Sequence, residues 1–351
     1  MDDLLAEVGP ADKAADAPLY FPPSNGLYEV KAGFTGLRSD FGNGAMDGRV
    51  FQIDGQFAAY RAAKLQARAE RLSKYYQTFR LPPQATAAVC VFVCQRLAEE
   101  YPEHFAWRAA AGDTSAGEPG GGRGGSLDCV LTGEILHFGE GMVLERVETK
   151  GEELRPPYAS AFDALACQVQ SDLNITCRRE DGSDWLAAIH VCAANHWAPE
   201  QKVGLPFTEV HVPVPGIKPI VDQAPRWVRA MVTKGPFVRF VWGVAADTRL
   251  NHHPEPPPGM DGARWHNRHF DPANPRLFMR VEREVMWGFP EVGASLFTIR
   301  TSFRDGEVLR RDPELSAQLA AAIESMSPAS LEYKGLAETS DDIVAWLREA
   351  R

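Results

Sequence analysis

Several features that would assign a cellular location or a cofactor are missing from this sequence of 351 residues. It has no run of about 18 apolar residues, the length that a membrane-spanning helix requires. Met1 to Ala17 is acidic and rich in alanine, unlike the basic start of a secretory signal peptide. Its six cysteines show no Cys-x-x-Cys spacing, which argues against a zinc or iron–sulfur site. We therefore expect a cytoplasmic protein with reduced thiols and no membrane partner.

The sequence also lacks an excess of basic over acidic residues. The net charge of -10 argues against nucleic acid as a partner, because binding phosphates requires a basic surface. The glycine-rich stretch 116–125 lacks both glycine patterns that bind phosphates, so we interpret it as a flexible surface loop. No Gly-x-Ser-x-Gly elbow occurs, and Cys192 near His190 is too generic a pair to indicate a nucleophile.

The composition is that of a soluble globular protein, with 44% hydrophobic and 24% charged residues. Strong helix formers without glycine or proline predict a helix at 56–76, and a second helix should follow at 84–100. Further helices are predicted at 163–170, 222–232, 313–326 and 341–351, and a proline-rich loop is predicted at 254–275. Short apolar or β-branched runs between turn residues predict strands at 129–131, 141–147, 173–177, 185–191, 207–214, 237–244, 277–285 and 294–301.

This order predicts an α+β fold in which helices are added at both ends of an antiparallel sheet core. We expect a disordered tail at 1–17, a main domain with an N-terminal helical portion at 18–310, and C-terminal helices at 311–351.

Histidine is concentrated between residues 185 and 215, which hold His190, His196 and His211. His211 precedes Val-Pro-Val-Pro, and the two prolines fix the backbone and remove two N–H donors. A side chain held in this way suits a metal ligand whose direction matters. His190 lies on a predicted strand and is the second candidate.

Two other histidine arrangements are weaker. His252 and His253 precede the proline-rich loop, and we expect them to be exposed. An iron site of two histidines and one carboxylate could draw on His190, His196 and Glu200, but their spacing does not match such a site.

Arginine is concentrated between residues 225 and 304, a stretch that contains eleven Arg and one Lys but only seven acidic residues. On a strand, Arg280 and Glu282 point to one side of the sheet and Arg283 to the other. Such charges are costly to bury unless each is matched. The group is therefore either a structural ion pair or a clamp for the carboxylates of a bound cofactor.

Motifs in a consistent order carry a resemblance to a known family. Residues 190–204 read His-Val-Cys-Ala-Ala-Asn-His-Trp-Ala-Pro-Glu-Gln-Lys-Val-Gly, residues 210–215 read Val-His-Val-Pro-Val-Pro, and Arg239 and Trp242 form Arg-x-x-Trp. Related pieces lie at 170–173, 280–286, 289–290 and 297–301, with weaker echoes at 20–22, 51–54 and 333–336. From about residue 18 to 336 the chain resembles the haem-dependent oxidative N-demethylase α-subunit family.

The chain departs from the family pattern at two places. Glu284-Val285 stands where the family has Gln-Thr, and Ala194-Asn195 stands where it has Pro-Ser. Because these positions adjoin motif residues, the identity of the substrate is the property that the resemblance transfers least.

The resemblance implies a PAS-like core that binds haem b and uses O₂ to oxidise a small secondary amine such as dimethylamine, with release of formaldehyde. Such an activity would make the chain a monooxygenase. Electrons would come from NADPH through a separate reductase that carries FMN and a 2Fe-2S cluster. Oligomers are compatible with this picture.

The resemblance also assigns roles to residues. His211 would be the axial iron ligand, with His190 as the second choice, and Asp172 or Glu284 would hold an ammonium substrate by charge pairing. The residues implied at the cofactor are Arg239, Arg280, Lys202, Arg283, Trp242 and Glu282. Two alternatives stay open: a haem-binding PAS-like sensor or regulatory subunit without turnover, and a haem-free structural protein.

Overall fold

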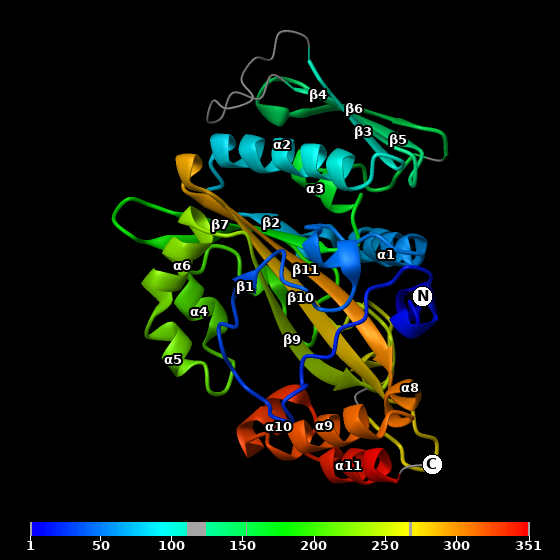
Figure 1. Cartoon of the computed structure of the whole chain (residues 1–351). Helices are drawn as coiled ribbons and strands as arrows, with labels where there is room; N and C mark the ends of the chain where they lie inside the picture. The colour runs from blue at the N-terminus through cyan, green and yellow to red at the C-terminus, as the bar shows by residue number, and fades with distance from the viewer. Residues whose placement is uncertain (1, 111–123, 152, 267–268, 350–351) are drawn as a thin grey trace.

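The computed structural model describes residues 2–110, 124–151, 153–266 and 269–349; most of the predicted glycine-rich loop lies outside them. In these ranges the chain forms two antiparallel sheets with helices between and around them (Figure 1). This arrangement confirms the predicted α+β class. None of the helices in these ranges is long and apolar enough to span a bilayer.

The large sheet has the strand order β1-β9-β10-β11-β7-β8-β2, and all of its neighbouring strands are antiparallel. Its strands are β1 (Thr35–Gly36), β2 (Tyr76–Thr78), β7 (Asp172–Arg178), β8 (Asp184–His190), β9 (Phe237–Ala245), β10 (Phe278–Phe289) and β11 (Ala294–Asp305). The five longest correspond to predicted strands, because their β-branched and apolar runs are marked in the sequence.

The small sheet is a meander of β3 (Phe105–Ala109), β4 (Gly125–Cys129), β5 (Glu134–Phe138) and β6 (Leu144–Thr149). Two of its strands overlap predicted ones at 129–131 and 141–147. Strand β5 was not predicted, although its buried and half-buried residues alternate with the period of a strand.

The helices are α1 (Phe57–Tyr75), α2 (Pro83–Glu100), α3 (Ala161–Ala166), α4 (Phe207–His211), α5 (Lys218–Val221), α6 (Ala224–Thr233), α7 (Gly262–His266), α8 (Gly306–Arg310), α9 (Pro313–Glu324), α10 (Pro328–Lys334) and α11 (Ser340–Arg348). Two predictions were wrong here. The stretch 207–214 is helix α4 and a turn instead of a strand, because Pro206 starts the helix and Pro213 and Pro215 prevent pairing in a sheet. The stretch 254–275 contains the short helix α7.

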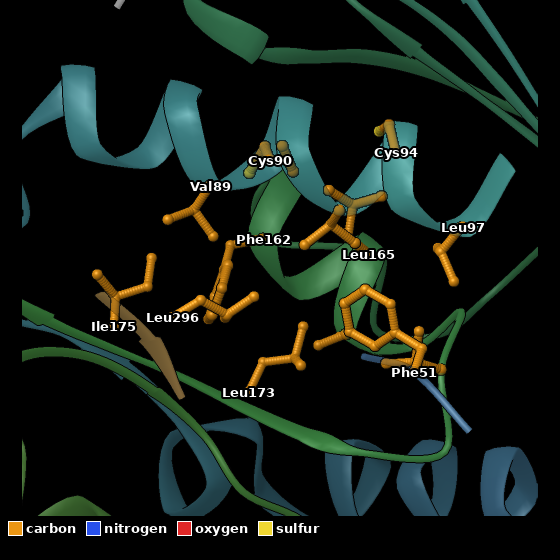
Figure 2. Packing of buried hydrophobic residues seen from close by; sticks show 14 of the residues in the cluster. Phe51, Val89, Cys90, Cys94, Leu97, Phe162, Leu165, Leu173, Ile175 and Leu296 are labelled. Atoms are coloured by element: carbon orange, nitrogen blue, oxygen red, sulfur yellow. The ribbon is translucent and has the colours of Figure 1, made fainter. Parts of the chain in front are cut away.

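The main core lies between the two sheets, around α2 and α3 (Figure 1). Leu97 of α2 and Leu165 of α3 pack with Leu173 of β7 and Leu296 of β11, and all four are fully buried (Figure 2). The core therefore fixes α2 and α3 on one face of the large sheet and leaves the opposite face for other elements.

Shortening Leu165 to alanine should destabilise the fold by about 2–5 kcal/mol, because the change removes buried methyl groups and leaves a cavity between closely packed elements. Urea unfolding at pH 7 measures this loss. Val130→Ala is the control, since Val130 is 65% exposed and should change stability by less than about 0.5 kcal/mol. An equal loss in both variants would contradict this packing.

Two further contacts tie other elements to the large sheet. Helix α6 approaches β10 so closely that a Cβ at Gly288 would lie 2.3 Å from the carbonyl oxygen of Val232, so this position requires glycine. The segment 2–17, predicted as a disordered tail, contacts the sheet: Arg304 Nε donates to Asp12 Oδ1 at 2.8 Å, and Val8 N donates to the Thr248 carbonyl at 3.2 Å. The predicted boundaries of the main domain stay predictions.

Candidate functional site

A cavity of about 1170 Å³ lies on the face of the large sheet opposite α2. Strand β7 shows the division between the two faces, because Leu173 and Ile175 enter the core while Asn174 and Thr176 line the cavity. Residues 19–34, helices α4–α6 and the end of α10 supply the other walls. Its volume slightly exceeds the roughly 300–1,000 Å³ of ordinary small-molecule sites, so a large cofactor and a small substrate would fit together.

His211 lies at the end of α4 and lines this cavity. Its Nδ1 is 2.7 Å from the carbonyl oxygen of Phe207, and since a carbonyl accepts, Nδ1 carries the proton. Nε2 then holds a lone pair, and within the described residues it has no hydrogen-bond partner. Burial lowers the pKa of His211 to about 4, against the raising effect of that hydrogen bond, so the ring is neutral at pH 7. These are the properties of an imidazole that binds a metal.

Three basic side chains line the same cavity. Lys202 donates to the Val210 carbonyl at 3.1 Å, and Arg239 Nε lies 3.0 Å from a carboxylate oxygen of Glu284. Lys334 was not predicted; it reaches from α10 to donate to the Trp242 carbonyl at 2.9 Å. Burial lowers the pKa of both lysines. The sequence held a weak signal for Lys334, since 333–336 echoes the family pattern.

Glu284 contributes an unusually weak acid to the cavity. It pairs in register with Arg239 of the adjacent strand, and its side chain is buried at the cavity wall. Burial raises the pKa of Glu284 to about 7, and the nearby Arg239 opposes this rise without cancelling it. Near neutral pH the cavity therefore contains a carboxyl group that changes its charge.

Arg280 and Glu282 face the cavity side and Arg283 the other, as the strand alternation predicts. Arg280 is occupied by protein acceptors: its Nε donates to Glu282 at 3.1 Å and its Nη2 to the Ala193 carbonyl at 2.6 Å. This geometry matches the structural ion pair, whereas Arg239 is better placed to meet an anionic cofactor.

Three predicted site residues lie outside the cavity. Arg283 donates to the carbonyls of Asp47 and Arg49 on the core side of the sheet. The carboxylate of Asp172 accepts from the backbone N–H groups of Cys192 and Ala193, at 3.0 and 2.9 Å. These contacts correct the assignment of Arg283 to the cofactor and of Asp172 to the substrate.

His190, the second choice for the iron ligand, is the third residue outside the cavity. It is fully buried, and its Nε2 lies 3.0 Å from Asp163 Oδ1. Asp163 in turn binds Arg68, which places His190 in a structural ion-pair group away from the cavity wall. The second choice therefore lies outside the cavity, and the identity of the iron ligand stays a prediction.

His252 and His253 were expected to be exposed, and this prediction was wrong: they are 2% and 1% exposed. A parallel bridge between Asn195 and His252 draws the segment inward. His252 lines the cavity, as does His196, whereas His253 pairs with Glu200 and does not. The residues next to His252 and His253 do not indicate this burial, because the contacting residues Asn195 and Glu200 lie about 55 positions away in the sequence.

The donor set of the cavity fits a flat aromatic cofactor with acidic substituents. The aromatic residues Trp197, Phe240, Trp242 and Phe297 supply apolar contact, His211 supplies a neutral nitrogen, and basic side chains lie nearby.

Comparison with known proteins finds one family model that matches. The family model described as "haem-dependent oxidative N-demethylase, alpha subunit-like" matches residues 44–344, which is most of the chain. Comparison with curated proteins gives no significant match.

Proposed function

Because the chain belongs to the haem-dependent oxidative N-demethylase α-subunit-like family, we propose that it oxidises a small amine at a haem bound in this cavity and releases formaldehyde. The observation that carries the proposal is His211, a neutral imidazole whose Nε2 has no hydrogen-bond partner within the described residues and which lines a cavity large enough for haem. We further propose haem b as the cofactor, a PAS-like core, and a separate reductase that supplies electrons, since the family description is of an α-subunit.

In this proposal His211 would bind the haem iron, Arg239 and Lys202 would neutralise the acidic arms of the cofactor, and Trp242 would pack against it. When bound, haem supplies the iron that reacts with O₂. The protein orients the substrate and excludes water. Arg280 contributes indirectly, by holding Glu282 and the Ala193 carbonyl in place at one end of the cavity.

Glu284 is the residue that we propose to bind the ammonium form of the amine. A buried carboxylate attracts a small cation because few water molecules screen the charge. Asp172 cannot share this role, since its two oxygens are occupied by backbone N–H groups outside the cavity.

The pH dependence of amine binding tests this role. Burial raises the pKa of Glu284 to about 7, so the carboxylate is present above that pH and is protonated as the pH falls through it. Affinity for dimethylammonium should therefore fall below about pH 7. Glu284→Gln should weaken binding by about 10–100-fold at pH 8, the value of a charged hydrogen bond. Isothermal titration calorimetry measures both effects. The exposed Glu291, changed to glutamine, is the control, and the same weakening there would contradict the assignment.

Turnover tests the reaction itself. Purified protein with bound haem, an electron-donating reductase, NADPH, O₂ and dimethylamine should release formaldehyde and methylamine in equal amounts. Haem binding with ligand-dependent spectral shifts but no formaldehyde across a panel of small amines would favour the sensor without turnover.

A further inference from the structure

One stretch of the surface is basic although the chain as a whole is acidic. Between residues 212 and 238 there are four basic residues and one acidic residue, whereas the chain carries a net charge of -10. The acidic residue, Asp222, is neutralised, because Lys218 Nζ donates to both of its oxygens at 2.7 and 2.9 Å. The other three basic residues are exposed and form no ion pair within the described ranges: Arg226, Arg229 and Lys234.

The sequence of α6 sets the direction of these side chains. Val228 and Met231 are buried on the inner side of the helix, and Met231 lines the cavity. Arg226 and Arg229 are three positions apart and exposed, so they lie together on the outer side. Lys234 follows at the C-terminal end of α6, which lies with α4 and α5 beside the large sheet (Figure 1). We call Arg226, Arg229 and Lys234 the basic patch.

An aromatic path connects the basic patch to the cavity. The Arg226 guanidinium carbon lies 5.4 Å from the centroid of the Trp227 ring. Trp227 meets Phe34 edge to face, with centroids 5.4 Å apart, and Phe34 lines the cavity. Phe34 also stacks on Phe237 at 5.2 Å, with 18° between the ring planes, which holds it in place. Along this path only two rings separate the surface from the cavity.

The proposed function consumes electrons that another molecule must supply. Conversion of an N-methyl group to formaldehyde takes up one O₂, two electrons and two protons, and yields the demethylated amine and one water. The cysteines of the chain lack the spacing of an iron–sulfur site that could store these electrons. Electron transfer slows steeply with distance, so an external carrier has to dock where the protein between it and the cavity is thin.

We propose that the basic patch is the docking surface for an acidic electron-carrier protein, an inference that rests on the proposed function. Opposite charges steer such a carrier and orient it, and redox complexes form with small interfaces. In each encounter the carrier loses one electron and the cofactor in the cavity gains it, with no covalent bond formed or broken. Two encounters supply one turnover. Nucleic acid fits this surface less well, since three basic residues neutralise few phosphates.

Salt-dependent binding tests the surface without haem. The probe is oxidised plant-type [2Fe–2S] ferredoxin, an acidic one-electron carrier, titrated into the haem-free chain in a calorimeter. Its affinity should fall by about 10-fold or more between about 20 and about 200 mM NaCl, because salt screens exposed charges. The triple variant Arg226→Glu, Arg229→Glu, Lys234→Glu should lower the affinity at low salt by about 10-fold or more and lose most of the salt dependence.

The matched control reverses three exposed basic residues that lie away from α6, in and after β6 and after α8: Arg146→Glu, Lys150→Glu and Arg311→Glu. It should keep the wild-type affinity for ferredoxin. Three results would overturn the docking surface. They are equal weakening in the two triple variants, no association of the wild type at low salt, and equally tight binding of a single-stranded DNA of about twelve nucleotides.

Electron transfer provides the second readout. In stopped-flow mixing of the haem-loaded chain with reduced ferredoxin, Trp227→Leu should slow haem reduction and leave ferredoxin binding unchanged. Trp107→Leu, which changes a half-buried tryptophan of the small sheet, should match the wild type. An unchanged rate in Trp227→Leu would overturn the aromatic path.

The two proposals can fail separately. A chain that binds no haem, but whose salt-dependent association with ferredoxin is lost when the basic patch is reversed, would refute the proposed function and keep the docking surface. Formaldehyde release that is equally fast in the wild type and the patch variant at low, limiting ferredoxin would do the opposite.

Discussion

Replacing His211 with alanine should abolish the Soret absorption of the haem-loaded protein, or shift it strongly at saturating haemin. The variant loses the one neutral imidazole of α4, whose Nε2 lies at the cavity while Nδ1 is fixed by the Phe207 carbonyl. Changing a residue that merely supports a metal ligand costs about 10–100-fold in affinity, so loss of the ligand itself should cost at least as much. Titration of the purified chain with haemin, followed by absorption spectroscopy, measures the change.

The matched control is His252→Gln, which alters another histidine of the same cavity. It should keep the Soret band because the Nε2 of His252 lies 3.0 Å from Asp247 Oδ1 and so is already in use. If His211→Ala keeps the spectrum and His252→Gln loses it, the iron ligand is His252 and the assignment of His211 fails.

Replacing Arg68 with methionine should destabilise the protein by about 3–5 kcal/mol, the cost of leaving one partner of a buried ion pair alone. Arg68 Nε and Nη2 donate to both oxygens of Asp163, at 2.9 and 2.7 Å, and both side chains are fully buried. Arg348→Met is the control: Arg348 and Glu324 are 58% and 42% exposed, and their pair should contribute about 0–1 kcal/mol. Urea unfolding at pH 7 compares the two variants, and equal losses would contradict the role of the buried pair.

The same pair predicts a pH dependence. Burial opposes the charge on Asp163, yet hydrogen bonds from His190 and Arg68 hold its pKa well below the ordinary value. A lowered pKa stabilises the folded state above the unfolded value of about 3.9, and this contribution is lost as the pH falls toward the folded pKa. The stability gap between wild type and Arg68→Met should therefore narrow below about pH 4. A gap that stays constant with pH would mean that packing, and not charge, accounts for the loss.

Features set by neighbouring residues could be predicted from the sequence. Helices α1 and α2 follow from runs of helix formers bounded by turn residues, and the long strands from β-branched runs. The alternation that separates Arg280 and Glu282 from Arg283 is a local property of any strand, and the structure confirms it.

Features set by distant partners could not be predicted. The position of helix α4 is one of them, because Phe207, Val210 and His211 line a cavity whose other walls come from distant parts of the sequence. Lys334 meets the Trp242 carbonyl 92 residues away, and His252 is buried by its bridge to Asn195. Sequence patterns report spacing along the chain, whereas these contacts depend on how the sheet and its covering elements assemble.

The central claim is that the cavity beside His211 holds one haem, and absorption spectroscopy of the full-length chain during haemin titration tests it most directly. The account predicts saturation at one haem per chain, with a Soret band that shifts on reduction with dithionite. A chain that stays colourless, or binds haemin without saturation and with the spectrum of free haemin, would contradict it.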